Sequence, residues 1–343
     1  MYFIPTSLIL FSYSVITFYY TFKNRREKIT KNLFTNEILI AILFLIAGIL
    51  FPFMYTYHSP RLSIERLHAL WLITSLVFSV EMIVWISTLV YNTSKIKNNP
   101  EILEEKNYET FGQNLHELWK NPYKSEFGRK FLHVLTSIVV LSSWIIGIIL
   151  EYTEVLSQLG LDIYNFSLCV IVIAGFGFVL MFQVADLARL NKFYLLPDWA
   201  ISWYKAMRPD ELDTFISSTP LILSFVPFVF APFPIFASVV FISTVADGAA
   251  CMIGKKLGKN KLKTNSNKTI EGFLAGGLFT FGIVVLITNV FHMWMPINWL
   301  KILSMAFVAT IIFLMVDLFS KNISDNILNP LLTGFGMWII LLI

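Results

Sequence analysis

Charged residues and cysteines are both scarce in this sequence. Asp, Glu, Lys and Arg make up 14% of its 343 residues, whereas soluble domains carry about a quarter. The two cysteines, Cys169 and Cys251, lie far apart in apolar surroundings, so they fit neither a disulfide framework nor the ligand spacing of a zinc site. The formal net charge of +4 is too small to indicate a nucleic-acid binder. These shortages argue against a soluble domain, a disulfide-stabilised domain and a nucleic-acid-binding protein.

The sequence contains long apolar runs, and 56% of its residues are hydrophobic. A helix that spans a bilayer needs roughly 20 apolar residues. The first run reaches that length and lacks the basic start and small-residue cleavage site of a signal peptide, so we interpret it as a true span. We therefore predict an all-α integral membrane protein, a bundle of about ten transmembrane helices, near residues 2–22, 35–57, 67–91, 131–150, 165–185, 214–230, 235–252, 271–292, 297–317 and 327–343.

Two of these runs need a separate interpretation. The runs at 214–230 and 235–252 are short, and Pro232 and Pro234 lie between them. They predict either a tight hairpin or one broken re-entrant element.

Basic residues after the first predicted span set the expected orientation. Lys23, Arg25, Arg26, Lys28 and Lys31 follow that span, whereas the loop 151–162 holds acids and no Lys or Arg. The positive-inside rule therefore predicts an N-terminus outside. By alternation, the predicted cytoplasmic segments are 93–128, 186–213, 253–269 and 318–326.

Two of the cytoplasmic segments have an amphipathic pattern. Apolar residues recur at helical spacing in both, and Lys or Glu residues occupy the other positions. Helices that lie in the membrane interface have this pattern, and so do helices that pack on a neighbouring loop. The apolar residues are Phe111, Leu115, Leu118 and Trp119 in the first segment, and Leu196, Trp199, Trp203 and Met207 in the second.

A change of composition near residue 125 predicts two parts. The first three spans contain few polar residues within the membrane, whereas the following spans contain the polar groups described next. We predict an N-terminal three-span membrane region with a cytoplasmic interfacial segment at 1–124, and a catalytic membrane domain at 125–343.

The richest polar segment runs from residue 243 to residue 277. Asp247 lies inside an apolar run, where a carboxylate costs ~2.5–3.5 kcal/mol on insertion scales and therefore implies a partner or a function. The lysine-rich loop that follows suits polyphosphate, because backbone N–H groups and ammonium charges can surround it. The loop does not have the spacing of a Walker A motif, and its lysines alone would equally fit an ordinary positive-inside loop. Its candidate phosphate-binding residues are Gly248, Gly254, Lys255, Gly258, Lys259, Lys268 and Gly272, with further lysines at 256, 261 and 263.

The end of this segment opens the next helix. Thr269 is the expected N-cap, and a helix N-terminus favours anionic phosphate. Glu271 lies in the first turn of that helix and is a candidate base.

Three smaller polar groups have simpler explanations beside the functional one. Arg129, Lys130 and His133 begin the fourth span, where basic anchoring explains the first two and a structural hydrogen bond often explains a lone histidine. Asp186 and Arg189, spaced i, i+3, would otherwise be a helix-surface ion pair.

The third group lies around the last loop and contains Asp317, Asp325, Asn326 and Pro330. Carboxylate and amide oxygens suit Mg²⁺, whereas turn chemistry and helix initiation also explain the last two residues. All three groups and Asp247 fall on one predicted face, and phosphoryl transfer requires acids for metal together with bases for phosphate.

Two segments resemble a known family. The residues from Ser243 follow S-x-x-x-D-G-x-A-x-x-x-G-x-x-x-G-K, and those from Lys268 follow K-T-x-E-G. This pair resembles the membrane polyprenol kinases, which include dolichol kinase, phytol kinase and CTP-dependent diacylglycerol kinase. It is more distantly similar to phosphatidate cytidylyltransferase. R-K-x-x-H from Arg129 and D-N-x-x-x-P-L from Asp325 follow the same order, so the resemblance covers about residues 125–343.

The resemblance implies a reaction and its partners. The donor would be CTP, or ATP, with Mg²⁺, and the acceptor would be a long isoprenoid alcohol of dolichol, phytol or geranylgeraniol type, or diacylglycerol, from the bilayer. Asp317 departs from the family, which usually carries Glu at this position. We assign Asp247, Asp325 and Asn326 to Mg²⁺, and Arg129, Lys130, Arg189 and Lys268 to phosphate; the proton acceptor would be Glu271, Asp186 or His133.

Two alternative functions remain at this stage. A cytidylyltransferase would make a CDP-lipid, but the sequence has no G-H-G-G or D-R-x-D element of that family. An ion-coupled transporter would carry polar residues on both faces and inverted repeats. Here the charged groups fall on one predicted face, so a kinase is the preferred interpretation.

Overall fold

The structure is a computed structural model that describes residues 1–24, 31–57, 62–262, 268–293 and 295–343. Throughout these residues the regular structure is helical, apart from one isolated β-bridge between Lys261 and Thr269. The predicted all-α membrane class is confirmed. The basic residues Arg25, Arg26 and Lys28, on which the predicted orientation depends, lie outside the described residues.

Eight helical stretches of the described chain are long and apolar enough to cross a membrane, so the chain is a multi-pass integral membrane protein. They correspond to predicted spans, with bounds that extend past the apolar runs at several ends. They are Leu33–Tyr57 (α2, Lys31–Leu50, with η1, Phe51–Phe53, and α3, Met54–Tyr57), Ile64–Asn98 (α4), Tyr123–Tyr152 (within α7, Pro122–Tyr152), Ile163–Leu195 (α9, Ile163–Lys192, with η2, Phe193–Leu195), Phe233–Leu257 (α12, Phe233–Phe241, η5, Ile242–Ala246, and α13, Asp247–Leu257), Ile270–Val290 (α14), Trp299–Phe319 (α15) and Asp325–Leu342 (α16).

Two predicted spans are not among the eight. The run at 2–22 forms the helix α1 (Ile4–Lys23), but hydroxyl groups lower its hydropathy. Several of them are buried, and Ser14 Oγ donates to the carbonyl oxygen of Ala41 at 2.7 Å. The run at 214–230 is broken into α11 (Ser218–Leu223) and η4 (Val226–Phe230), because prolines lie inside it.

The described chain forms two compact units, and α7 contributes to both. The N-terminal unit comprises residues 1–125 and 147–223, and the C-terminal unit comprises residues 126–146 and 224–343. Packing therefore groups 147–223 with the first three predicted spans. The predicted division at 124/125 concerns which part carries the chemistry, and it stays a prediction.

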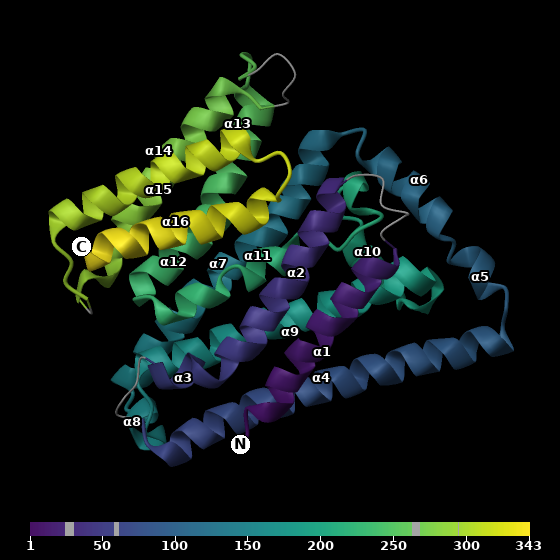
Figure 1. Cartoon of the computed structure of the whole chain (residues 1–343), viewed down its shortest axis with the longest axis horizontal. Helices are drawn as coiled ribbons and strands as arrows, with labels where there is room; N and C mark the ends of the chain where they lie inside the picture. Colours follow the sequence, from purple (N-terminus) through teal and green to yellow (C-terminus); the bar gives the residue numbers. More distant parts are fainter. Residues whose placement is uncertain (25–30, 58–61, 263–267, 294) are drawn as a thin grey trace. The chain divides into compact units, whose positions relative to one another are not determined.

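In the N-terminal unit, α1 packs along α2, and α4 packs along α9 (Figure 1). Phe78 of α4 contacts Phe176 of α9, with ring centroids 6.2 Å apart. Further along, the side-chain amide of Asn92 donates to the carbonyl oxygen of Leu195 at 2.7 Å. Because both contacts advance together along the chain, α4 and α9 run in the same direction.

The two amphipathic segments form α6 (Tyr108–Leu118) and α10 (Asp198–Tyr204), after the short helix α5 (Ile102–Glu105). Phe111 and Leu115 are buried in one apolar cluster with Leu196 and Met207, so these residues pack on neighbouring segments. By contrast, Trp199 is 50% exposed. Packing explains the buried half of the apolar pattern. The exposed tryptophan rings have the character of residues that lie in the membrane interface.

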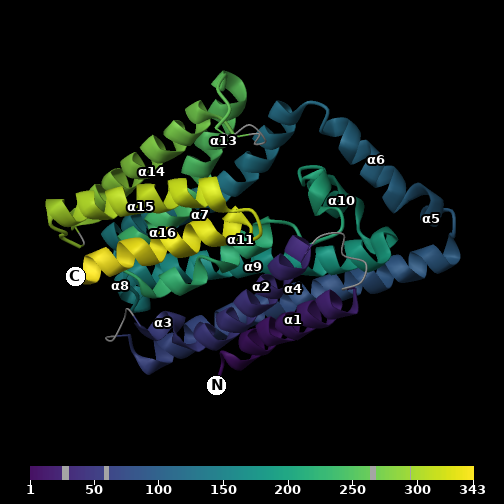
Figure 2. The ribbon, with the colours of Figure 1, turned by 45° about the horizontal axis from the view of Figure 1, so that its top comes forward.

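In the C-terminal unit, α14, α15 and α16 lie side by side, as Figures 1 and 2 show. Small residues permit the close packing, and Gly276 of α14 receives the ring of Phe313 from α15. Because α13, α14, α15 and α16 follow one another through short connections, neighbouring helices are antiparallel. The ends of α13 and α15 therefore meet the starts of α14 and α16 at one end of the unit.

Candidate active site

One face of α7 supplies a row of buried polar side chains. Asn121 caps this helix by accepting a hydrogen bond from the backbone N–H of Lys124, and Pro122 occupies its first turn. Four of its members are spaced three or four residues apart, which places side chains on one helix face, and Arg129 directly precedes one of them. Its members are Glu126, Arg129, Lys130, His133 and Ser137, each less than 9% exposed.

Lys130 pairs with Asp247 across this face. The ammonium group contacts Oδ2 of Asp247, and the two side chains are 8% and 18% exposed. The sequence predicted both residues as site residues but assigned them to phosphate and metal separately. The structure brings them together as an ion pair.

A π-helical segment positions Asp247. It is η5 (Ile242–Ala246), which interrupts the otherwise α-helical span and ends immediately before Asp247. Within it, Thr244 donates to the carbonyl oxygen of Val240 at 2.8 Å, and its hydroxyl also shares a hydrogen bond with Ser137 of α7. Such segments are rare and occur frequently at functional sites. A π-helical turn holds one more residue than an α-helical turn, so the residues from Asp247 onward are rotated relative to a continuous α-helix.

Glu126 is a member of the α7 row that the sequence analysis missed. Its Oε2 accepts from Nε and Nη2 of Arg129, both at 2.8 Å, and its Oε1 lies 3.4 Å from Nζ of Lys255. Arg129 and Lys255, both predicted to bind phosphate, therefore share one carboxylate. The i, i+3 spacing of Glu126 and Arg129 was the signal available in the sequence.

Lys268 and Asp317 form a second pair. Nζ of Lys268 donates to Oδ1 and to the backbone carbonyl of Asp317, each at 2.6 Å. The side chains are 39% and 20% exposed, so this pair is more open to solvent than the first. Asp317 is thus the partner of a predicted phosphate-binding lysine, at the position where the sequence departs from the resembled family.

The residues assigned to Mg²⁺ lie at helix ends of the same unit. Asp325 and the buried Asn326 form the first turn of α16, which Ser324 caps. The negative charges of Asp247 and Asp325 both act on the Asp317 carboxylate. Among the described residues no three acids, histidines or cysteines converge as a complete metal cage. One or two carboxylates with water and phosphate are sufficient for Mg²⁺, and binding of that ion by Asp247, Asp325 and Asn326 stays a prediction.

Glu271 closes the lysine-rich loop. Its Oε1 accepts from the backbone N–H groups of Lys259 and Asn260, at 3.1 and 3.2 Å, and from the Asn260 side-chain amide at 3.1 Å. Thr269 caps α14 through the N–H of Gly272 at 3.2 Å, as predicted. The assignment of Glu271 as a base stays a prediction, and the geometry gives it a structural role. Lys263 lies outside the described residues.

The glycines of this region differ in what surrounds them. A Cβ on Gly272 would lie 2.7 Å from the carbonyl oxygen of Ala250, and a Cβ on Gly258 would lie 2.2 Å from that of Gly254. The first contact shows that close packing of α13 on α14 requires glycine at 272. The second lies within α13 and its C-cap, so the end of that helix requires glycine at 258. A Cβ on Gly248 would meet no described atom within 4 Å, so there is room beside Asp247. Nucleotide binding by Gly248, Gly254, Gly258 and Gly272 stays a prediction.

Asp186 and Arg189 belong to the N-terminal unit, where both are fully buried. Oδ1 of Asp186 accepts from Nε and Nη2 of Arg189, at 3.0 and 2.9 Å, and its Oδ2 accepts from the N–H of Ile216 at 2.8 Å. The guanidinium also donates to the carbonyl oxygens of Leu212 and Thr214. The pair therefore anchors the segment 212–216 to α9. Roles in catalysis and in phosphate binding stay predictions.

Tyr204 of α10 covers this pair, with its ring centroid 5.1 Å from Cζ of Arg189. Burial raises the pKa of the Tyr204 phenol well above its ordinary value, and the negative charge of Asp186 adds to the effect. The phenol therefore stays neutral, and its ring contributes a cation–π contact.

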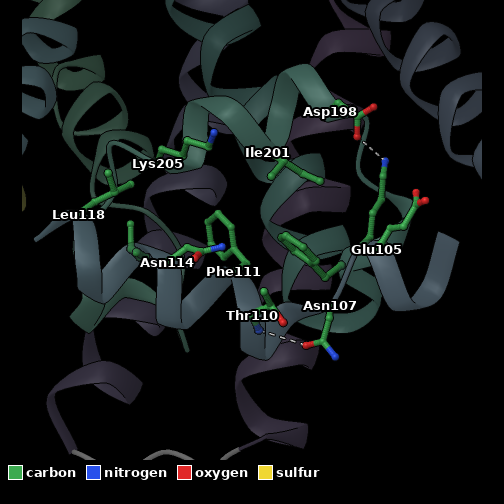
Figure 3. A pocket seen from close by; sticks show the side chains of 12 residues that line it. Glu105, Asn107, Thr110, Phe111, Asn114, Leu118, Asp198, Ile201 and Lys205 are labelled. Carbon is green, nitrogen blue, oxygen red and sulfur yellow. Dashed lines mark hydrogen bonds and ion pairs between the residues drawn. The ribbon is translucent and has the colours of Figure 1, made fainter.

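A cavity of 260 Å³ lies between α6 and α10, in the N-terminal unit (Figure 3). Phe111 and Ile201 form apolar walls, and the ion pair of Lys106 with Asp198, 2.8 Å long, lies at its edge. None of the predicted site residues lines it.

Comparisons with protein-family models, with curated proteins and with solved structures gave no match. The resemblance to the polyprenol kinases stays a prediction from the sequence motifs.

Proposed function

We propose that this chain is a lipid-alcohol kinase that transfers the γ-phosphoryl group of CTP, or of ATP, to the hydroxyl of a long isoprenoid alcohol or of diacylglycerol. The observation that carries the proposal is the pairing of Lys130 with Asp247 and of Lys268 with Asp317 in one compact unit. Phosphoryl transfer requires cations and carboxylates held in fixed positions, because its catalysis rests on positioning and charge neutralisation. These pairs provide both kinds of group within one unit.

The lysines are the proposed donor site. Lys130 and Lys268 would exchange a carboxylate oxygen for a phosphate oxygen, which forms a charge-assisted hydrogen bond of the same kind. The exposed lysines of the loop, such as Lys256 and Lys259, would add positive charge around the polyphosphate. The space beside Gly248 would let a phosphate approach the backbone next to Asp247. By the predicted orientation this face is cytoplasmic, where nucleotides are present.

Mg²⁺ would be held by Asp247, Asp325 and Asn326, and when bound it would neutralise charge on the donor phosphates. The carboxylates of Asp247 and Asp317 hold Lys130 and Lys268 in place, and phosphate oxygens would take over these contacts.

The bond changes involve few protein groups. The acceptor hydroxyl oxygen bonds to the γ-phosphorus, the bond from that phosphorus to the β–γ bridging oxygen breaks, and a nucleoside diphosphate leaves. The hydroxyl proton passes to a side-chain base. We favour His133, because it lies on the same α7 face as Lys130, whereas Glu271 closes a loop and Asp186 anchors a segment.

The decisive experiment uses the purified full-length protein in detergent with Mg²⁺ and γ-labelled CTP or ATP. Geranylgeraniol, phytol, dolichol and diacylglycerol are offered separately, and the lipid phase is analysed for a labelled monophosphate. We expect label with at least one pair of donor and acceptor. A parallel assay supplies α-labelled CTP with phosphatidic acid and looks for CDP-lipid. Label only in CDP-lipid would replace the kinase by a cytidylyltransferase, and no label in either assay would contradict an enzyme of this class.

A further inference from the structure

One acidic residue in a membrane-spanning helix belongs to none of the groups above. Glu81 lies at the middle of α4, which runs from Ile64 to Asn98. At 1.5 Å per residue, it is about 26 Å from either end of the helix. The hydrocarbon core of a bilayer is about 30 Å thick, so Glu81 lies deep within it. An ionisable residue at that depth is costly and marks a function by default.

Glu81 lines a pocket of 470 Å³ between α4 and α9. Its Oε2 lies against Gly177 of α9, 3.3 Å from where a Cβ would be. The walls beyond it are apolar and include Ile173 and Phe178. Trp85, one turn from Glu81 on α4, and Trp199 also line the pocket, with ring centroids 5.4 Å apart. Every residue that lines the pocket belongs to the N-terminal unit.

Within the described part of the chain, no hydrogen bond or ion pair reaches the Glu81 carboxyl group. Three other polar side chains line the pocket. The Thr88 hydroxyl already donates to the carbonyl oxygen of Val84 at 2.8 Å, and Trp85 and Trp199 carry indole N–H groups, which can only donate. In the bilayer core a polar group without a hydrogen bond is costly, whether it faces protein or lipid. The carboxyl group is therefore the group in the pocket to which a ligand would form a hydrogen bond.

The bilayer itself supplies the molecules that fill such a pocket. An acyl chain would cover the apolar walls and leave the carboxyl group without a hydrogen bond. A charged headgroup would have to give up its hydration at this depth. A neutral hydroxyl avoids both costs, because it donates to a carboxylate and accepts from a carboxylic acid.

We propose that this pocket binds an uncharged membrane lipid that carries a hydroxyl group, with the hydroxyl on Glu81 and the hydrocarbon chain along Ile173 and Phe178. The site does not rest on the proposed kinase activity, because its residues and its chemistry are separate from those of the lysine–carboxylate pairs.

The test uses the full-length protein in nanodiscs of phosphatidylcholine, a lipid without a hydroxyl group. The probe is a clickable, diazirine-bearing long-chain alcohol, and its methyl ether is the matched control. After irradiation, labelled peptides are mapped by mass spectrometry. We expect the alcohol to label residues 84–88 and 173–181 at least 5-fold more than the ether does. Equal labelling by the two probes, or labelling spread evenly over lipid-facing residues, would overturn the proposal.

Variants sharpen the test. Glu81→Leu should reduce labelling by the alcohol to the level of the ether, whereas Glu81→Gln should keep most of it, since an amide also forms hydrogen bonds. Ala174→Phe should block the pocket to both probes. Glu65→Leu, in the first turn of the same helix and away from the pocket, is the control. Unchanged labelling in both Glu81→Leu and Ala174→Phe would also overturn the proposal, and the comparison of probes on the wild-type protein decides the question if a variant misfolds.

Discussion

For Lys130 and Asp247, the contribution of a buried ion pair to stability has to be distinguished from its contribution to function. Removing two charges from water costs about as much as their attraction returns, so such a pair is often no more stable than two apolar residues. Removing one partner is different, because the other charge is then left buried and uncompensated. Stability alone therefore does not explain these two residues in an apolar region, whereas the proposed exchange of Asp247 for a phosphate at Lys130 would.

A double-mutant cycle tests this argument. Lys130→Met and Asp247→Leu should each lower the free energy of unfolding by about 3–5 kcal/mol, and the double variant should recover most of that loss. Lipid phosphorylation should fall at least about 100-fold in all three, because a group that stabilises transition-state charge is missing. Thermal unfolding in detergent and the label-transfer assay give the two readouts. A double variant that regained activity together with stability would show that the pair is structural.

Two glycines next to the site make a matched comparison. Gly248→Ala adds a methyl group where no described atom lies within 4 Å, so stability should stay the same or rise by about 0.5–1 kcal/mol through helix propensity. Gly272→Ala forces a Cβ to 2.7 Å from a backbone oxygen and should cost about 1–3 kcal/mol.

Activity should also distinguish the two variants, because Gly248→Ala is expected to weaken nucleotide binding although it does not lower stability. If phosphate approaches the backbone beside Asp247, Gly248→Ala should raise the KM for nucleotide about 10-fold despite a stable fold. Melting temperature and nucleotide titration measure the two effects. An unchanged KM in Gly248→Ala would remove the proposed phosphate approach at that residue.

Among the elements, those that depend on local signals were predictable. Thr269 was expected to cap α14 because a threonine precedes an apolar helix with an acid in its first turn, and the structure confirms the cap. The π-helical segment before Asp247 was not expected. It adds one residue to a turn without changing the apolar pattern, so the sequence carries no periodic signal for it. The pairing of Lys130 with Asp247 was missed for a related reason, because their partnership joins two helices far apart in the chain.

The loop after α13 offers a prediction at the level of an element. Glu271→Gln removes the charge that strengthens the hydrogen bonds from Lys259 and Asn260. Amide hydrogen exchange at these two residues should become faster, and the KM for nucleotide should rise about 10-fold, while kcat should change about 2-fold or less, since the loop positions lysines and performs no chemistry.

The exposed acid Glu104 serves as the control, and Glu104→Gln should change neither quantity. A loss of kcat in Glu271→Gln at unchanged KM and unchanged exchange would instead indicate that Glu271 is the proton acceptor, as the sequence analysis had allowed.

For the whole molecule, the sequence predicted the class and most of the spans but not the division into units. Apolar runs report which segments enter a membrane, and α1 shows the limit of that signal, because its hydroxyl groups are buried against other helices. The packing of 147–223 with the first 125 residues depends on contacts between distant segments. Glu81 escaped notice because one acid in a 35-residue helix hardly changes its hydropathy, and the structure was needed to place the pocket beside it.

The buried hydrogen-bond network around Arg189 leads to a prediction about the stability of the N-terminal unit. Arg189 and Asp186 are both 0% exposed in their side chains, and Arg189 also holds the carbonyl oxygens of Leu212 and Thr214. Arg189→Met should lower the free energy of unfolding by about 3–5 kcal/mol, because the Asp186 charge is left without compensation. Lys120→Met breaks a pair of the same spacing whose side chains are 72% and 64% exposed, and it should cost less than about 0.5 kcal/mol.

The same variants separate a structural Arg189 from a phosphate ligand. A structural role predicts that Arg189→Met lowers the melting temperature and that the remaining folded protein keeps its KM for nucleotide. Binding of phosphate by Arg189 predicts a raised KM with a smaller change in melting temperature, since the guanidinium would then be needed at the donor site. The guanidinium already donates to the carboxylate of Asp186, to the phenol oxygen of Tyr108 and to two carbonyl oxygens. We therefore expect the first result, with the nucleotide contacts provided by the lysines of the C-terminal unit.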